Sequence, residues 1–217
     1  MGTLLAVCRV HQLRPDPEGS VGTTAIDKRP VDGPVRVRVL GLHGDVQADR
    51  ADHGGPDKAL YAYADEAAQQ WVAELGREVG PGAFGENLRT RGVDVDGAEI
   101  GERWRIGAGD DAVEVEVTMP RTPCATFARY LGEARWLRRF TDRGLSGAYL
   151  RVLGTGTVGA GDAVEVVGRP GHGVSVRDVF TGASPAQAGA LLQAHTSGAT
   201  PLAADLLPYL LSVAARG

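Results

Sequence analysis

Apolar and polar positions alternate in several short segments, and this two-residue period predicts β-strands. In residues 4–10 the period places Leu4, Ala6, Cys8 and Val10 on one face, so Cys8 is expected in the core. Further strands are expected at residues 35–39, 112–117, 148–153 and 163–167. Several strands of this kind, joined by glycine-rich turns, favour a β-barrel or sandwich over a doubly wound sheet.

Helical spacing predicts helices beside these strands. Apolar residues four positions apart predict a helix over residues 65–79, which Gly80 and Pro81 would stop. Residues 127–140 are also expected to be helical, with a break at Gly132. These helices would lie at the periphery of the β structure.

The composition shifts to alanine and leucine toward the C-terminus. Ser184 and Pro185 predict the start of one helix, and two more leucine-rich stretches extend to Ala215. The expected fold class is therefore mainly β. A barrel-like domain with peripheral helices would occupy residues 1–170, and a small three-helix segment would occupy residues 174–217.

The composition also limits the classes of function. With 43% hydrophobic and 23% charged residues among 217, the chain can bury an ordinary globular core. Its formal net charge of -4 argues against broad nucleic-acid binding, which depends on clustered Lys and Arg. No apolar run reaches the roughly 20 residues needed to cross a bilayer, so a cytoplasmic protein without membrane contact is expected.

The two cysteines are too few for a disulfide scaffold, and both are expected as thiols in a reducing compartment. Cys124 follows Pro123 at the end of a predicted strand, and the fixed φ of proline favours a corner that could hold a thiol toward a pocket. Arg121, three residues earlier, could favour the thiolate, which is the form that binds metal. Taken alone, however, a single cysteine is more often a small buried hydrophobic residue than a ligand.

Other polar candidates lie in loops, and each has two interpretations. His53, beside two glycines, could bind a ligand or transfer a proton, or it could only stabilise its own loop. Lys28 and Arg29 could neutralise a phosphate or belong to the solvated surface. Asn87, next to Glu86, could line a site or satisfy a turn. The common nucleotide, dinucleotide and zinc signatures are absent from the sequence.

Taken in order, the loop motifs resemble those of the MOSC family, in its YiiM-like branch. The matching positions are IDKRP (26–30), GLHGD (41–45), Asp49, HGGPDK (53–58), Tyr63, Trp71, PGAFGENL (81–88), IG (100–101), PRTPC (120–124) and GD (161–162). Ordered agreement over about 140 residues is far more specific than any single motif.

This resemblance implies a MOSC β-barrel-like domain followed by three helices, and it implies molybdenum cofactor (molybdopterin). Cys124 matches the family's molybdenum-ligating cysteine. By the same match Lys28, Asn87, Arg121 and His53 are expected to line the cofactor or substrate pocket. The resemblance leaves open whether Lys28 or Arg29 contacts the cofactor.

The activity that the resemblance implies is reduction of N-hydroxylated compounds to the N–H form. Substrates would be N-hydroxylated bases such as 6-hydroxylaminopurine, amidoximes or hydroxylamines, and His53 would donate a proton or anchor the substrate. Because two distant cysteines cannot hold an iron–sulfur cluster and no flavin signature occurs, the electrons are expected from an external reductase.

Three other interpretations remain open at this point. Cys124 could carry a persulfide in a sulfur-transfer protein, or the chain could store the cofactor without turnover. It could also be a structural barrel with Cys124 in its core, although this would leave the joint arrangement of the loop motifs unexplained. The C-terminal helices could mediate a homodimer or simply pack on the barrel.

Overall fold

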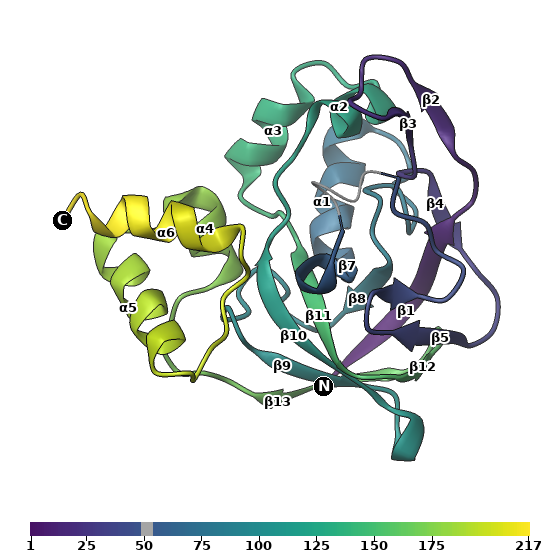
Figure 1. Ribbon diagram of the computed structural model, residues 1–217. Coiled ribbons are helices and arrows are strands. Elements are labelled where there is room, and N and C mark those ends of the chain that lie inside the picture. Colours follow the sequence, from purple (N-terminus) through teal and green to yellow (C-terminus); the bar gives the residue numbers. More distant parts are fainter. Residues whose placement is uncertain (49–53) are drawn as a thin grey trace.

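Seven strands close into a barrel in the computed structural model, which describes residues 1–48 and 54–217 (Figure 1). Each neighbouring pair around the ring is antiparallel except β7 and β8, which are parallel. The order around the ring is β13 (Ala163–Gly168), β9 (Arg103–Ile106), β10 (Val113–Pro120), β11 (Ala148–Gly154), β7 (Leu60–Ala64), β8 (Leu88–Arg91) and β1 (Gly2–Val10). The prediction of a mainly β, barrel-like fold is confirmed.

The barrel closes where the first strand meets the last. Gly2 of β1 pairs with Val164 of β13, and Thr3 pairs with Ala163. Leu4 and Cys8 are fully buried, as the alternating pattern predicts for the inner face of β1. The valines at 113, 115 and 117 are buried in the same way along β10.

Shorter strands lie outside this ring. Strand β4 (Lys28–Pro30) pairs with β1 in a segment that the sequence indicates only as a loop. A hairpin of β2 (Arg14–Asp16) and β3 (Gly22–Thr24) projects near the helices at the top of Figure 1. A further sheet is formed by β5 (Val35–Arg38), β6 (Gly41–Leu42) and β12 (Gly156–Val158). The chain also contains the short 3₁₀ helices η1 (Pro56–Lys58) and η2 (Gly109–Asp111).

Helices α1 (Asp65–Leu75), α2 (Ala125–Leu131) and α3 (Trp136–Arg143) share an aromatic cluster beside the barrel. The break at Gly132 is confirmed, because this glycine adopts a left-handed conformation with φ 68°. The predicted end of α1 at residue 79 is wrong. Gly76 already ends the helix with φ 64°, and its N–H donates to the carbonyl of Val72.

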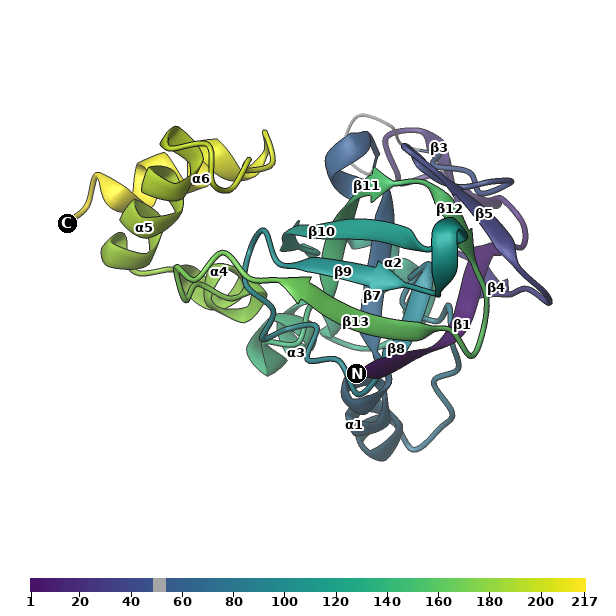
Figure 2. The same cartoon turned by 90° about the horizontal axis from the view of Figure 1, so that it is seen from below.

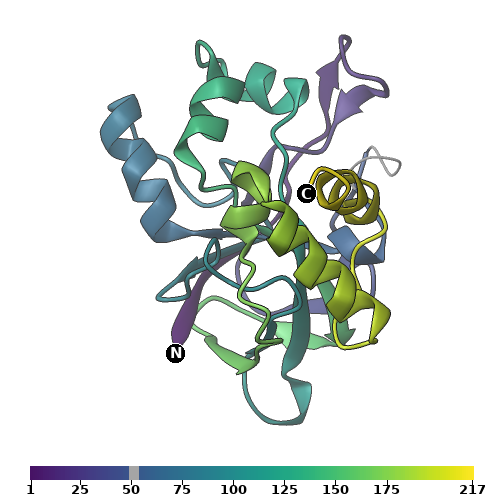
Figure 3. The same ribbon diagram turned by 90° about the vertical axis from the view of Figure 1, so that its left-hand side faces the viewer.

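Within residues 54–217, three helices follow the barrel and lie to one side of it (Figures 2 and 3). They are α4 (Val176–Gly182), α5 (Pro185–Thr196) and α6 (Leu206–Ala214). Ser184 caps α5 as predicted, but α4 precedes it, so the expectation of two further helices after α5 is wrong. The predicted division between residues 170 and 174 falls between β13 and α4, and the assignment of two separate domains stays a prediction. No helix in the described part of the chain is long and apolar enough to cross a membrane.

A buried carboxyl makes the stability of this fold depend on pH. Burial raises the pKa of Asp96 from 3.8 to about 6, although a hydrogen bond from the N–H of Gly147 favours the ionised form. The folded chain therefore holds this proton more tightly than the unfolded chain between about pH 4 and pH 6. The free energy of unfolding should fall as pH rises through that window, by about 3 kcal/mol from this group.

Asp96→Asn is expected to remove this contribution. Urea denaturation of the wild type and the variant at about pH 4 and pH 7 measures it. Between the lower and the higher pH, the free energy of unfolding should fall more for the wild type than for the variant. An identical difference at both values would contradict the assignment.

Candidate functional site

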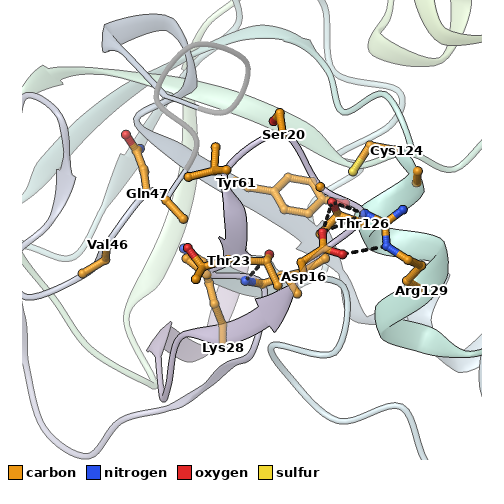
Figure 4. Close-up of a pocket in the computed structure, with 18 of the residues that line it drawn as sticks. Asp16, Ser20, Thr23, Lys28, Val46, Gln47, Tyr61, Cys124, Thr126 and Arg129 are labelled. Carbon is orange, nitrogen blue, oxygen red and sulfur yellow. Dashed lines mark hydrogen bonds and ion pairs between the residues drawn. The ribbon is translucent and has the colours of Figure 1, made fainter.

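A cavity of about 320 Å³ opens beside the β2–β3 hairpin and brings together segments from across the chain (Figure 4). Its walls come from the hairpin and the loop after it, residues 46–48, η1, β7, residues 84–87, the chain from Arg121 into α2, and β11. Four of the predicted site residues line it: Lys28, Asn87, Arg121 and Cys124. The loop motifs therefore meet in one place.

Cys124 is the N-cap residue of α2 and is partly exposed on the cavity wall. Strand β10 ends at Pro120, so the expectation that Cys124 ends a strand is wrong. A short connection that includes Pro123 separates strand from helix, because proline has no N–H with which to extend the ladder. The thiol thus lies at the junction of a strand and a helix, which fixes its backbone on both sides.

Arg121 is buried, lines the same cavity as Cys124, and has an unsatisfied donor. Its side chain packs on Phe127, with the guanidinium carbon 3.8 Å from the ring centroid, and lies 5.6 Å from the ring centroid of Tyr61. The residue is 5% exposed, and its Nη1 has no hydrogen-bond partner within residues 1–48 and 54–217. A buried charged donor without an acceptor is costly, so an anionic ligand in the cavity would satisfy it.

Lys28 lines the cavity as part of a buried polar group. Its Nζ lies 2.5 Å from Asp45 Oδ2, and the amide of Asn87 donates to the same oxygen at 2.8 Å. The Asn87 side-chain oxygen also accepts from the N–H of Tyr61, so Asn87 links β7 to the ion pair. Gly82 packs closely against the backbone of Lys28. A Cβ at this position would lie 2.2 Å from the Lys28 carbonyl oxygen, so only glycine fits here.

The other predicted residues are placed differently. Arg29 is 53% exposed at its side chain and pairs with Asp27, and it is not among the described residues that line the cavity. Of the two neighbouring cations, the structure therefore directs Lys28 toward the cavity. His53 lies outside the described residues.

The cavity also contains residues that sequence reasoning did not assign. Lys58 of η1 lines it, with Nζ 6.0 Å from the ring centroid of Tyr149 on β11. Burial raises the pKa of Tyr149, so its hydroxyl stays protonated as a possible donor. Tyr61 lies beside it, with ring centroids 5.5 Å apart. Lys58 stands at the end of the HGGPDK motif, but nothing in the sequence distinguishes Tyr149 from any other strand tyrosine.

One ionic contact fastens the hairpin to the helix that begins after Cys124. The carboxylate of Asp16 accepts two hydrogen bonds from Arg129 and one from Thr126, each at 2.7 Å (Figure 4). These hydrogen bonds, first the one from Arg129, hold the pKa of Asp16 below its ordinary value. Since residues 18–21, 23 and 24 of the hairpin line the cavity, this contact keeps one wall in place.

Asp16→Asn should loosen the hairpin without unfolding the barrel. Charged hydrogen bonds of this kind are strong enough that proteolysis within residues 17–21 should become about tenfold faster. Glu18→Gln is the matched control, because the Glu18 side chain is 77% exposed and its ion pair with Arg129 is long, at 3.8 Å. Equal cleavage rates in the two variants would show that Asp16 does not hold the hairpin.

The comparisons with known proteins identify the family of this chain. The model of the MOSC domain matches residues 49–165. The Bacillus subtilis protein named "Uncharacterized protein YflK" is 37% identical over 160 residues, which cover 74% of this chain and 71% of that protein. A Gibberella moniliformis protein named "Reductase" is 34% identical over 172 residues, which cover 78% of this chain but only 30% of that protein.

The same relationship extends to solved structures. The crystal structure of YiiM from Geobacillus stearothermophilus matches with a TM-score of 0.75 and 26% sequence identity. The match covers 98% of each chain, so it includes the C-terminal helices as well as the barrel.

Proposed function

Because this chain belongs to the MOSC domain family, we propose that its cavity binds molybdenum cofactor, that Cys124 ligates the molybdenum, and that the loaded protein reduces N-hydroxylated compounds. The observation that carries the proposal is that one cavity is lined by a partly exposed thiol and by a buried arginine whose Nη1 has no partner among the described residues. The thiol of Cys124 offers a metal ligand, and Arg121 offers a contact for an anion in the same cavity.

The residues present fit this cofactor. A pterin with a phosphate and a dithiolene carries negative charge, and the cavity supplies Arg121, Lys28 and Lys58 as cations. A thiolate is the form of cysteine that binds metal, and Cys124 lines the same cavity as the cationic Arg121. The rings of Tyr61 and Tyr149 add flat apolar surface against which a heterocycle would pack.

In the proposed reaction an N-hydroxylated compound takes up two electrons and two protons, its N–O bond breaks, and the N–H compound and water are released. When bound, the molybdenum centre would supply the two-electron chemistry, while the protein binds and orients the reactants. The Asp45–Asn87 contact keeps Lys28 on the cavity wall. Tyr149 keeps its proton and can donate a hydrogen bond to the substrate oxygen. His53 remains the predicted proton donor from the sequence.

The test begins with metal analysis. Protein expressed in a host that makes molybdenum cofactor should contain close to one molybdenum and one pterin per chain. Reduced, loaded protein should then be reoxidised by a hydroxylamine or an amidoxime, but not by the corresponding amine or amidine. Metal-free wild type would argue for the persulfide carrier instead. Loaded protein that no N-hydroxylated compound reoxidises would argue for storage.

The partners stay predictions. An external reductase, a homodimer, the absence of nucleic-acid and membrane partners, and a cytoplasmic location all follow from the sequence alone.

A further inference from the structure

Three cations that line the cavity each lie beside a carboxylate. The pairs are Lys28 with Asp45, Arg129 with Asp16, and Lys58 with Asp205. The first two carboxylates are nearly buried, with side-chain exposures of 9% and 7%. Asp205 differs in two ways, because its side chain is 60% exposed and it comes from the C-terminal helical segment rather than from the barrel.

Hydrogen bonds hold the C-terminal segment against η1. Asp57 Oδ1 accepts from Arg151 of β11 at 2.6 Å, and its other oxygen accepts from the N–H of Ala204 at 3.2 Å. The residues that follow Asp57 and Ala204 complete the contact, since Lys58 Nζ lies 2.6 Å from Asp205 Oδ2. The barrel and the segment before α6 therefore meet at the edge of the cavity.

We propose that Lys58 is an exchangeable anion-binding residue of the cavity and that Asp205 is its resting counter-ion. When a phosphate group enters the cavity, Lys58 leaves Asp205 and binds the phosphate. The Asp205 carboxylate is then hydrated by solvent. Asp205 is thus a positioning residue that acts on the ligand through Lys58. The inference rests on the proposed function only in taking the phosphate of the cofactor as the natural ligand.

The free-energy cost of breaking the ion pair distinguishes Lys58 from the other two cations. Moving Lys28 or Arg129 to a ligand would leave Asp45 or Asp16 as a nearly buried carboxylate without its cation, which is strongly unfavourable. Asp205 is already mostly hydrated, so losing its partner costs little. The flexible stem of lysine also allows its ammonium group to change partners.

Phosphate affinity of the cofactor-free, full-length protein tests the proposal. Inorganic phosphate is titrated at constant ionic strength, and binding is measured by calorimetry and by NMR. Asp205→Asn should bind phosphate about two- to fivefold more tightly than wild type, because the ligand no longer competes with Asp205 for Lys58. Lys58→Met should bind about tenfold more weakly. The double variant should match Lys58→Met, because the effect of Asp205 passes through Lys58.

Asp142→Asn is the matched control for net charge. Asp142 is also an exposed carboxylate, with 67% side-chain exposure, and it pairs with Arg138 on α3. Its replacement should leave phosphate affinity unchanged. Thermal denaturation of every variant reports separately on folding, so a purely structural contact would lower stability without tightening phosphate binding.

The proposal is overturned if Asp205→Asn binds phosphate no more tightly than Asp142→Asn, if its effect persists in the Lys58→Met background, or if wild type shows no saturable binding. These outcomes are distinct from failure of the proposed function. Protein that binds phosphate as expected but acquires no molybdenum would reject the function and keep the ion exchange. Protein that acquires molybdenum but whose phosphate affinity is unchanged by Asp205→Asn would keep the proposed function and reject the ion exchange.

Discussion

Cys124→Ala is expected to lower the molybdenum content by at least about tenfold and to abolish N-hydroxy reduction, while the barrel stays folded. The side chain is only partly buried, so its loss removes little packing. Metal and pterin analysis of wild type and variant from the same expression host measures the effect. Circular dichroism and thermal denaturation confirm that the variant is folded.

Cys8→Ala is the matched control because Cys8 is the other thiol of the chain. It is fully buried, and burial raises its pKa to about 12, so it stays a protonated core residue. The variant should lose about 1 kcal/mol of stability and keep its molybdenum. If Cys124→Ala retained the metal content of Cys8→Ala, the ligand assignment would be wrong.

The largest loss of stability is expected from Arg89→Met, at about 3–5 kcal/mol. The side chains of Arg89 and Glu86 are fully buried and paired, with Arg89 Nε donating to Glu86 Oε1 at 2.9 Å. Burial disfavours the charged arginine, but the charge and hydrogen bond of Glu86 and the charge of Asp65 together outweigh this and raise the pKa of Arg89. Removing Arg89 therefore leaves a buried carboxylate without its cation. Urea denaturation at neutral pH measures the loss.

Two further variants test this explanation. Arg91→Met should have a much smaller effect, because Arg91 pairs with Asp65 at 2.7 Å but is 61% exposed at its side chain. The double variant Glu86→Gln with Arg89→Met should recover part of the loss, since the unpaired charge is gone. Equal losses for Arg89→Met and Arg91→Met would contradict the role of burial.

The strands that the sequence predicts are those with one face in the core. Strand β1 has a buried face that includes Leu4 and Cys8, and valine alternates with glutamate in the sequence of β10 from residue 113 to residue 117. Strand β7 is different, because all five of its residues are buried and α1 follows directly and packs against it. Its burial on both faces removes the two-residue period, so no pattern reveals it.

The candidate site was predictable where the chemistry is local. Cys124 and Arg121 stand in one short motif, and both line the cavity. The pairing of Lys58 with Asp205 was not predictable, because it joins positions 147 residues apart and depends on how the C-terminal segment lies on the barrel. The role of Asn87 was equally hidden, since its partners come from three separate strands and loops.

The closure of the ring by β1 and β13 has a consequence for synthesis on the ribosome. Strand β1 emerges before every other strand of the ring, but its partner β13 is made only after all the others. Until then one edge of β1 carries unpaired N–H and C=O groups, which are prone to pair with other chains. Nascent chains arrested before β13 should therefore depend on chaperones more than chains arrested after it.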